Sequence, residues 1–159
     1  MDLSQNGDDK RETVFAALQV AVVDVLSRMA MTEALFVHRE KMNRFYLDME
    51  AGAMIRLTGD WEGMIGISGS LELVRSIVSR IVGLPAEQLN TADLMDGIAE
   101  LANMVGGGTK SNAGMANVKV HPPMAVIGKE VMAEWKTDRS TEKFIFEVEE
   151  STLLVLANL

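Results

Sequence analysis

Hydrophobic residues recur at helical spacing near the start of this chain and at two further places. Apolar side chains repeat every three or four residues over 10–31, which predicts a long helix with one apolar stripe. Ahead of that helix, residues 1–9 are polar and acidic, so we expect a flexible tail there. The same spacing predicts a second helix over 71–82, with Ser70 as its N-cap and Gly83 ending it.

A third helix is expected to begin after Asn90 and to run at least to Val105. The Asn90 side chain can cap the first turn of this helix. Asp93 stands three residues further on, where its carboxylate can reach back to the cap and meets the positive end of the helix. The start of the third helix is therefore well marked by local chemistry.

Elsewhere the apolar positions alternate or form short continuous runs, which predicts strands. The runs 53–57 and 63–69 flank turn residues and indicate a hairpin. The segment 32–51 is weaker, because 35–37 fits a short strand and 44–49 fits either a strand or a helical turn. Past residue 115 we expect strands at 118–120, 124–127, 131–135, 143–149 and 152–157, with a turn at 137–141. This order predicts an α+β fold, and a helix followed by a strand pair in each half suggests a duplicated unit.

Composition and charge remove several classes of function. The net charge of −8 is spread along the chain and no segment is basic, which disfavours binding to nucleic acid. Cysteine is absent and His38 and His121 are the only histidines, so nothing in the spacing indicates a metal site. No uninterrupted apolar run approaches the ~20 residues of a membrane helix, and the N-terminus lacks a secretory signal. We expect a cytoplasmic protein with one domain over 10–159 and no membrane or nucleic-acid partner.

One face of the third helix carries the candidate chemistry. Steps of four and three residues place a polar stripe there, made of Asp96, Glu100, Asn103, Gly107 and Lys110. Glu100 and Asn103 are neighbours on this stripe, one turn apart. The carboxylate can hold a cation of a partner, and the carboxamide can donate and accept hydrogen bonds at once, as orienting a water requires. Taken alone, such a pair is more often ordinary solvated surface.

The glycines at 106–108 are unusual inside a helix, because each costs up to ~1 kcal/mol relative to alanine. Either the helix ends at these glycines, or something approaches its backbone closely. The stretch 106–111 is not a phosphate-binding loop, since Thr109 rather than glycine precedes Lys110 and a helix rather than a strand precedes the glycines. The sequence therefore excludes nucleotide binding by that motif here.

A wider window resembles a known protein family. Residues 96–110 are similar to the motif helix of the CheC/CheX chemotaxis phosphatases, which carries Glu, two apolar or small residues, Asn, and then Gly three positions later. Residues 57–68 resemble the hairpin that precedes this helix in the family, and 122–128 resemble the segment that follows it. Because the three matches agree in order and spacing over about 53–135, the chain resembles a CheX-type member.

The resemblance implies a CheC-like fold, in which a β-sheet carries two long helices and the halves are pseudo-duplicated. It also implies hydrolysis of the aspartyl phosphate of a CheY-type response regulator. Glu100 would then pair with the regulator's lysine and Asn103 would orient the attacking water. Asp96, Gly107 and Lys110 would bind the partner. The magnesium would belong to the regulator, so the resemblance implies no cofactor on this chain.

Two further expectations follow from the resemblance. The first helix has no Glu with an Asn three residues on, which predicts one active helix, and CheX-type members form homodimers. The main alternative is a non-catalytic, CheC-like binding module of a signalling or flagellar switch complex. The intact Glu100 and Asn103 disfavour that alternative. A chance match in an unrelated α+β domain is a third possibility.

Overall fold

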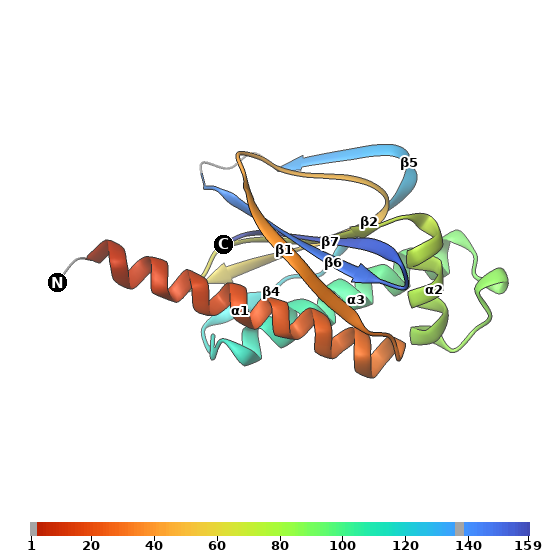
Figure 1. The fold of residues 1–159 in the computed structure, drawn as a ribbon, viewed down its shortest axis with the longest axis horizontal. Coiled ribbons are helices and arrows are strands. Elements are labelled where there is room, and N and C mark those ends of the chain that lie inside the picture. The colour runs from red at the N-terminus through yellow and green to blue at the C-terminus, as the bar shows by residue number, and fades with distance from the viewer. Residues whose placement is uncertain (1–2, 136–138) are drawn as a thin grey trace.

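The structure is a computed structural model that describes residues 3–135 and 139–159. Helices lie on one face of an antiparallel seven-stranded sheet (Figure 1). The helices are α1 (Leu3–Ala30), α2 (Leu71–Val82), the 3-10 helix η1 (Ala86–Gln88) and α3 (Thr91–Asn112). The strands are β1 (Ala34–Met42), β2 (Phe45–Gly59), β3 (Gly63–Gly69), β4 (Val118–Val120), β5 (Met124–Trp135), β6 (Thr141–Val148) and β7 (Ser151–Asn158).

The sheet consists of two interlocked halves. Its order is β1-β6-β7-β3-β2-β4, with β5 also paired to β2. The hairpins β2–β3 and β6–β7 meet in the centre, where β3 pairs with β7. The strand that precedes each hairpin pairs with the other half, because β1 pairs with β6 and β5 pairs with β2. This confirms the α+β, CheC-like fold with pseudo-duplicated halves. Each half supplies a long helix and three strands rather than a strand pair, and the second half also supplies the short strand β4.

The core lies between the sheet and the two long helices. Leu18 and Leu26 of α1 and Ile98 of α3 are fully buried, opposite the buried Ile55 of β2 and Phe144 of β6. These residues belong to one continuous apolar cluster. Side chains alternate between the two faces of a strand, so one face of the sheet packs its apolar residues against α1 and α3.

Local capping chemistry sets the helix starts as the sequence predicted. Ser70 Oγ accepts a hydrogen bond from Leu73 N at 3.1 Å, and α2 ends at Gly83 in the left-handed conformation. At the start of α3, Asn90 Oδ1 accepts from Asp93 N at 2.8 Å while Asp93 Oδ2 accepts from Asn90 N at 3.0 Å. This is a complete capping box.

The structure corrects the predicted N-terminus. Helix α1 begins at Leu3, so residues 3–9 are helical where the sequence predicted a tail, and their flexibility stays a prediction. By length and composition, Asn6–Ala30 is also apolar enough to cross a membrane, although Gln19 interrupts its apolar run. Residues of this helix such as Leu18 are buried in the fold, which is the behaviour of a core helix.

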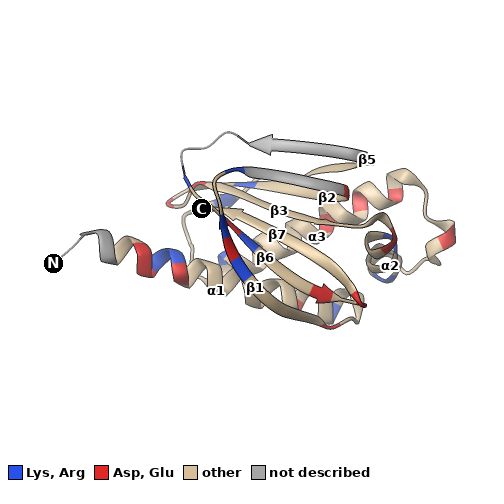
Figure 2. Cartoon of the chain, turned by 45° about the horizontal axis from the view of Figure 1, so that its top comes forward, with Lys and Arg blue, Asp and Glu red and all other residues tan. Residues whose placement is uncertain are grey.

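The strands differ from the prediction mainly in length. The weak segment 32–51 contains the whole of β1 and the first part of β2, so a helical turn at 44–49 is wrong. The two short strands predicted at 124–127 and 131–135 are one continuous strand, β5. The predicted turn at 137–141 lies partly outside the described residues. Strand β1 forms an edge of the sheet and carries charges of both signs near its end (Figure 2).

Candidate functional site

Two glycines of α3 face its neighbours at points where no side chain would fit. A Cβ added to Gly97 would lie 2.3 Å from Val78 Cγ1 of α2. A Cβ added to Gly106 would lie 2.0 Å from Ile55 Cδ1 of β2. Real side chains do not tolerate such distances, so these glycines let α3 seat directly on α2 and on the sheet. The helix continues through the glycines to Asn112.

The opposite face of α3 looks outward. Asp96, Glu100 and Asn103 are all exposed, while Ile98 and Leu101 between them are buried. Glu100 and Asn103 are three residues apart on a regular helix and therefore neighbours on this face. Within the described part of the chain, no hydrogen bond or ion pair engages their polar groups. Both side chains are free to meet a partner.

An open depression of about 540 Å³ adjoins these residues. Its lining residues are Asp96, Ala99, Glu100 and Asn103 from α3, with Val120, Pro122 and Pro123 from the chain that follows it. The α3 side of this depression is polar and the other side is apolar. The structure thus brings together three of the five predicted site residues, Asp96, Glu100 and Asn103.

The apolar side is held in place by pairing with β2. Strand β4 pairs there, with Val120 opposite Leu57. His121 N donates to Arg56 O at 2.9 Å, and a His121 ring nitrogen lies 2.7 Å from Thr58 Oγ1. These bonds fix the chain just before the two prolines, whose rings restrict the backbone further.

The sequence reasoning did not place Pro122 and Pro123 at the site. The prolines entered the prediction only within 122–128, the segment that resembles the one after the family's motif helix. Two signals were available: the likeness of 122–128 to the family's segment after the motif helix, and the position of the prolines directly after a short predicted strand, 118–120. Neither signal reveals which strand the segment pairs with, and this pairing is what brings the prolines to the depression lined by Asn103.

Gly107 and Lys110 lie farther along the same helix. Both are partly exposed, and neither lines the depression. The predicted stripe is therefore continuous along α3, but only its first part adjoins a hollow surface. The corresponding helix of the other half, α1, pairs Asp24 with Arg28 at 2.9 Å and has no Glu and Asn at this spacing.

The polar groups of the site are better suited to binding a partner protein than to binding a metal ion. Among the described residues, no group of three or more His, Cys, Asp or Glu side chains is placed to hold a metal ion. Two exposed carboxylates, Asp96 and Glu100, can attract a cationic group of a partner. A carboxamide beside them can accept one hydrogen bond of a water and donate another to a neighbouring acceptor.

Comparison with protein families decides whether the motifs reflect family membership or a chance match in an unrelated α+β domain. The family described as "Chemotaxis phosphatase CheX" matches residues 51–147, a range that contains the hairpin, all of α3 and the proline segment. The chain belongs to this family. The family membership confirms the resemblance read from the three motifs.

Several solved structures share the fold of this chain. A CheX from Desulfovibrio desulfuricans has a TM-score of 0.82 at 16% identity, covering 91% of this chain and 97% of that one. The CheX of a CheX-CheY-BeF3-Mg complex from Borrelia burgdorferi has a TM-score of 0.68 at 15% identity, covering 91% and 96%. The FliM middle domain from H. pylori has a TM-score of 0.64 at 9% identity, covering 99% and 92%. A search of curated proteins gave no match.

Proposed function

We propose that this CheX-family chain hydrolyses the phosphoryl group on the aspartate of a CheY-type response regulator. The observation that carries the proposal is the exposed Glu100 and Asn103, side by side on α3 at an open depression. Membership of a family described as chemotaxis phosphatases supports the reaction. A structure of the same fold in complex with CheY supports the partner.

In this proposal the two side chains act in trans, inside the partner's site. The Glu100 carboxylate pairs with the regulator's lysine and sets the orientation of α3 on the partner. Asn103 extends toward the phosphoryl group, where its carboxamide holds a water in line with the aspartyl oxygen. The water oxygen forms a new bond to phosphorus while the bond to the aspartyl oxygen breaks. The products are the free aspartate carboxylate and inorganic phosphate, which takes both protons of the water and exchanges them with solvent.

An asparagine side chain neither accepts nor releases a proton at neutral pH, so its contribution is positional. Positioning and electrostatic stabilisation are the main resources in phosphoryl transfer, because the transition state requires little covalent help from the protein. The magnesium belongs to the regulator in this scheme. Asp96, Gly107 and Lys110 are proposed to contact the regulator around the central pair.

Two further parts of the proposal do not affect this chemistry. We expect the chain to form a homodimer and to work in the cytoplasm, where CheY-type regulators act. Glu100 and Asn103 come from one helix of one chain, so each protomer would carry a complete site of its own.

The direct test follows the decay of a phosphorylated CheY-type regulator from the same organism, with and without this protein. The expected result is faster decay that is lost in Asn103→Ala. Asn112→Ala is the matched control, since Asn112 is an exposed asparagine at the end of the same helix. Acceleration that survives Asn103→Ala contradicts the assigned role. No acceleration for any regulator of the organism contradicts the proposed function.

The alternative function is a non-catalytic binding module. The shared fold with the FliM middle domain favours considering it. A module of this kind would bind a regulator or switch protein without changing the lifetime of the aspartyl phosphate. The decay experiment combined with a binding measurement separates the two functions, because only the phosphatase shortens that lifetime.

A further inference from the structure

Gly107 has no role that the fold itself explains. Unlike Gly83, it has no left-handed backbone conformation that would require glycine. A Cβ added at Gly107 would meet no heavy atom within 4 Å among the described residues, in contrast to its neighbour Gly106. Glycine in a helix interior is less favourable than alanine, because it gains no contacts and loses more backbone freedom. Glycine at position 107 therefore lowers the stability of the helix slightly, and no contact among the described residues offsets this loss.

Position 107 has a special relation to Asn103. On a helix, the residue four positions further on lies directly above, and its side chain leans back toward the N-terminal turn. A side chain at position 107 would therefore cover the surface around Asn103. The residue four positions before Asn103 is Ala99, which is also small. Asn103 therefore projects farther from the helix than Ala99 and Gly107, which lie one turn before and one turn after it on the same face.

The absence of long side chains at positions 99 and 107 matters because the asparagine side chain is itself short. Its carboxamide can enter a recessed site of another protein only if the helix backbone comes close to the rim of that site. A long side chain at position 107 would meet the rim first and hold Asn103 away. The partner must therefore place its main chain, rather than long side chains, against the helix turn at Gly107.

We propose that Gly107 controls how closely the regulator can approach α3. Its missing side chain leaves a clearance that lets the regulator's loops come near enough for Asn103 to reach the phosphoryl group. This inference rests on the proposed function, which it deepens. Gly107 takes no part in the chemistry. It acts by allowing the main chain of the regulator, at the rim of its phosphorylation site, to lie against the helix backbone.

The test compares Gly107→Gln with Gly107→Ala and with a matched control, Gly7→Gln. Gly7 is also a helical, exposed glycine whose added Cβ would meet nothing within 4 Å, but it lies near the start of α1. Three quantities are measured: the kcat/KM for dephosphorylation of the regulator, the binding of the BeF3-activated regulator, and the urea midpoint of unfolding. Size-exclusion chromatography reports any change in self-association.

The expected result for Gly107→Gln is a kcat/KM lower by about 100-fold, the loss typical of a positioned group displaced by ~1 Å. Gly107→Ala should lose less, because a methyl group projects less than a carboxamide side chain. Neither variant should lower the urea midpoint, since both add a better helix former at an open position. Gly7→Gln should leave kcat/KM and binding unchanged. A loss of activity without loss of stability is not what a structural role would produce.

Several results would overturn the inference. One is a Gly107→Gln variant with wild-type kcat/KM and wild-type binding. Another is a loss of activity that follows a changed oligomeric state. If the wild type binds the activated regulator but does not hydrolyse its phosphate, the proposed function fails while weaker binding of Gly107→Gln still supports the clearance at position 107. If the wild type shows neither binding nor hydrolysis, both fail.

Discussion

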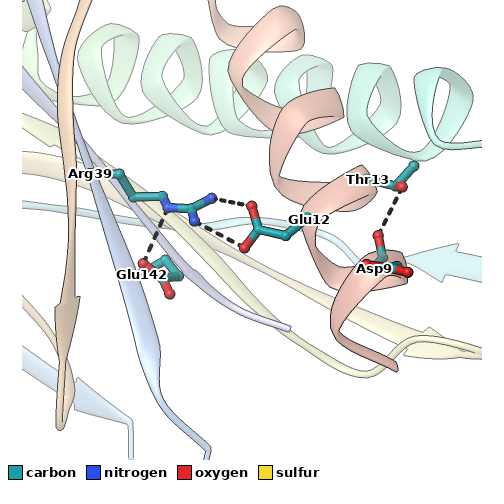
Figure 3. Close-up of polar contacts among 5 residues, drawn as sticks. All are labelled: Asp9, Glu12, Thr13, Arg39 and Glu142. Carbon is teal, nitrogen blue, oxygen red and sulfur yellow. Dashed lines mark hydrogen bonds and ion pairs between the residues drawn. The ribbon is translucent and has the colours of Figure 1, made fainter. Parts of the chain in front are cut away.

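Arg39 of β1 donates two hydrogen bonds to the carboxylate of Glu12 on α1, from Nη1 at 3.0 Å and from Nη2 at 2.9 Å (Figure 3). Its Nε lies 3.5 Å from Glu142 Oε2, in the neighbouring strand. The guanidinium also lies over the rings of Phe15 and Phe144. The hydrogen bond to Glu12 is the main reason that the pKa of Arg39 is raised, with burial acting in the opposite direction. One cation thus joins α1 to the edge of the sheet.

Replacing this cation should destabilise the fold through Glu142. In Arg39→Met the apolar stem can still cover the two rings, but the Glu142 carboxylate, only 5% exposed, loses its partner. We expect a loss of about 2–4 kcal/mol in the free energy of unfolding, because an uncompensated buried charge is costly and Arg39 is itself partly exposed. Urea unfolding measures this loss.

The matched controls separate the two carboxylates. Glu12 is mostly exposed, so Glu12→Gln should cost no more than about 1 kcal/mol. The double variant Arg39→Met/Glu142→Gln should recover part of the loss, since the buried charge is then gone. Equal losses for Arg39→Met and Glu12→Gln would show that Glu142 does not carry the effect.

Adjacent glycines of α3 should respond in opposite directions to alanine. Gly106→Ala places its Cβ against Ile55, which is buried, and should cost about 1–3 kcal/mol through overpacking. Gly107→Ala should stabilise by up to about 1 kcal/mol, because it adds helix propensity in open space. Adding Ile55→Val to Gly106→Ala removes the clashing methyl and should recover stability. Thermal or urea unfolding of the four proteins checks the order, and the same sign at both glycines would refute it.

The negative charge of Glu100 should matter for the partner and not for the fold. Glu100→Gln is exposed and should stay within about 0.5 kcal/mol of the wild type in unfolding free energy. Its affinity for the activated regulator should fall by about tenfold, equivalent to ~1.4 kcal/mol, with a weaker dependence on salt. Asp96→Asn, one turn away, is the control and should lose less. Titration calorimetry at two salt concentrations tests this, and equal losses would remove the special role of Glu100.

The edge strand carries a titration that can be checked directly. The Lys143 ammonium lies 3.2 Å from Glu40 Oε1 across the β1–β6 pair. Its hydrogen bond and charge lower the pKa of the Glu40 carboxyl below its ordinary value of 4.5. The contribution of this pair to stability is therefore present above pH 4.5 and is lost as the pH falls through the lowered pKa.

Lys143→Met should return the pKa of Glu40 most of the way to its ordinary value. His38, 3.7 Å from the other Glu40 oxygen, leaves a smaller lowering of the pKa when it is protonated. NMR titration of the side-chain carboxyl measures both proteins. An unchanged pKa in Lys143→Met would show that the pair does not form in solution.

Much of the fold was predictable because it depends on neighbours in the sequence. The capping box of Asn90 and Asp93 and the start of α2 at Ser70 use hydrogen bonds over three residues. The apolar spacing of α3 likewise fixes which of its residues point outward, and this placed Glu100 and Asn103 side by side. In contrast, the weak segment 32–51 becomes regular strand only because β1 pairs with β6, far along the chain.

The sequence by itself determined the helix that carries the candidate pair, the exposed side of that helix and the family to which the motifs point. Only the tertiary structure decided what faces the pair. Pro122 and Pro123 reach the site because β4 pairs with β2, and Gly106 is explained by Ile55 while Gly107 is not. The reason is physical: helical spacing and caps act over a few residues, whereas strand pairing and close packing depend on groups that only folding brings together.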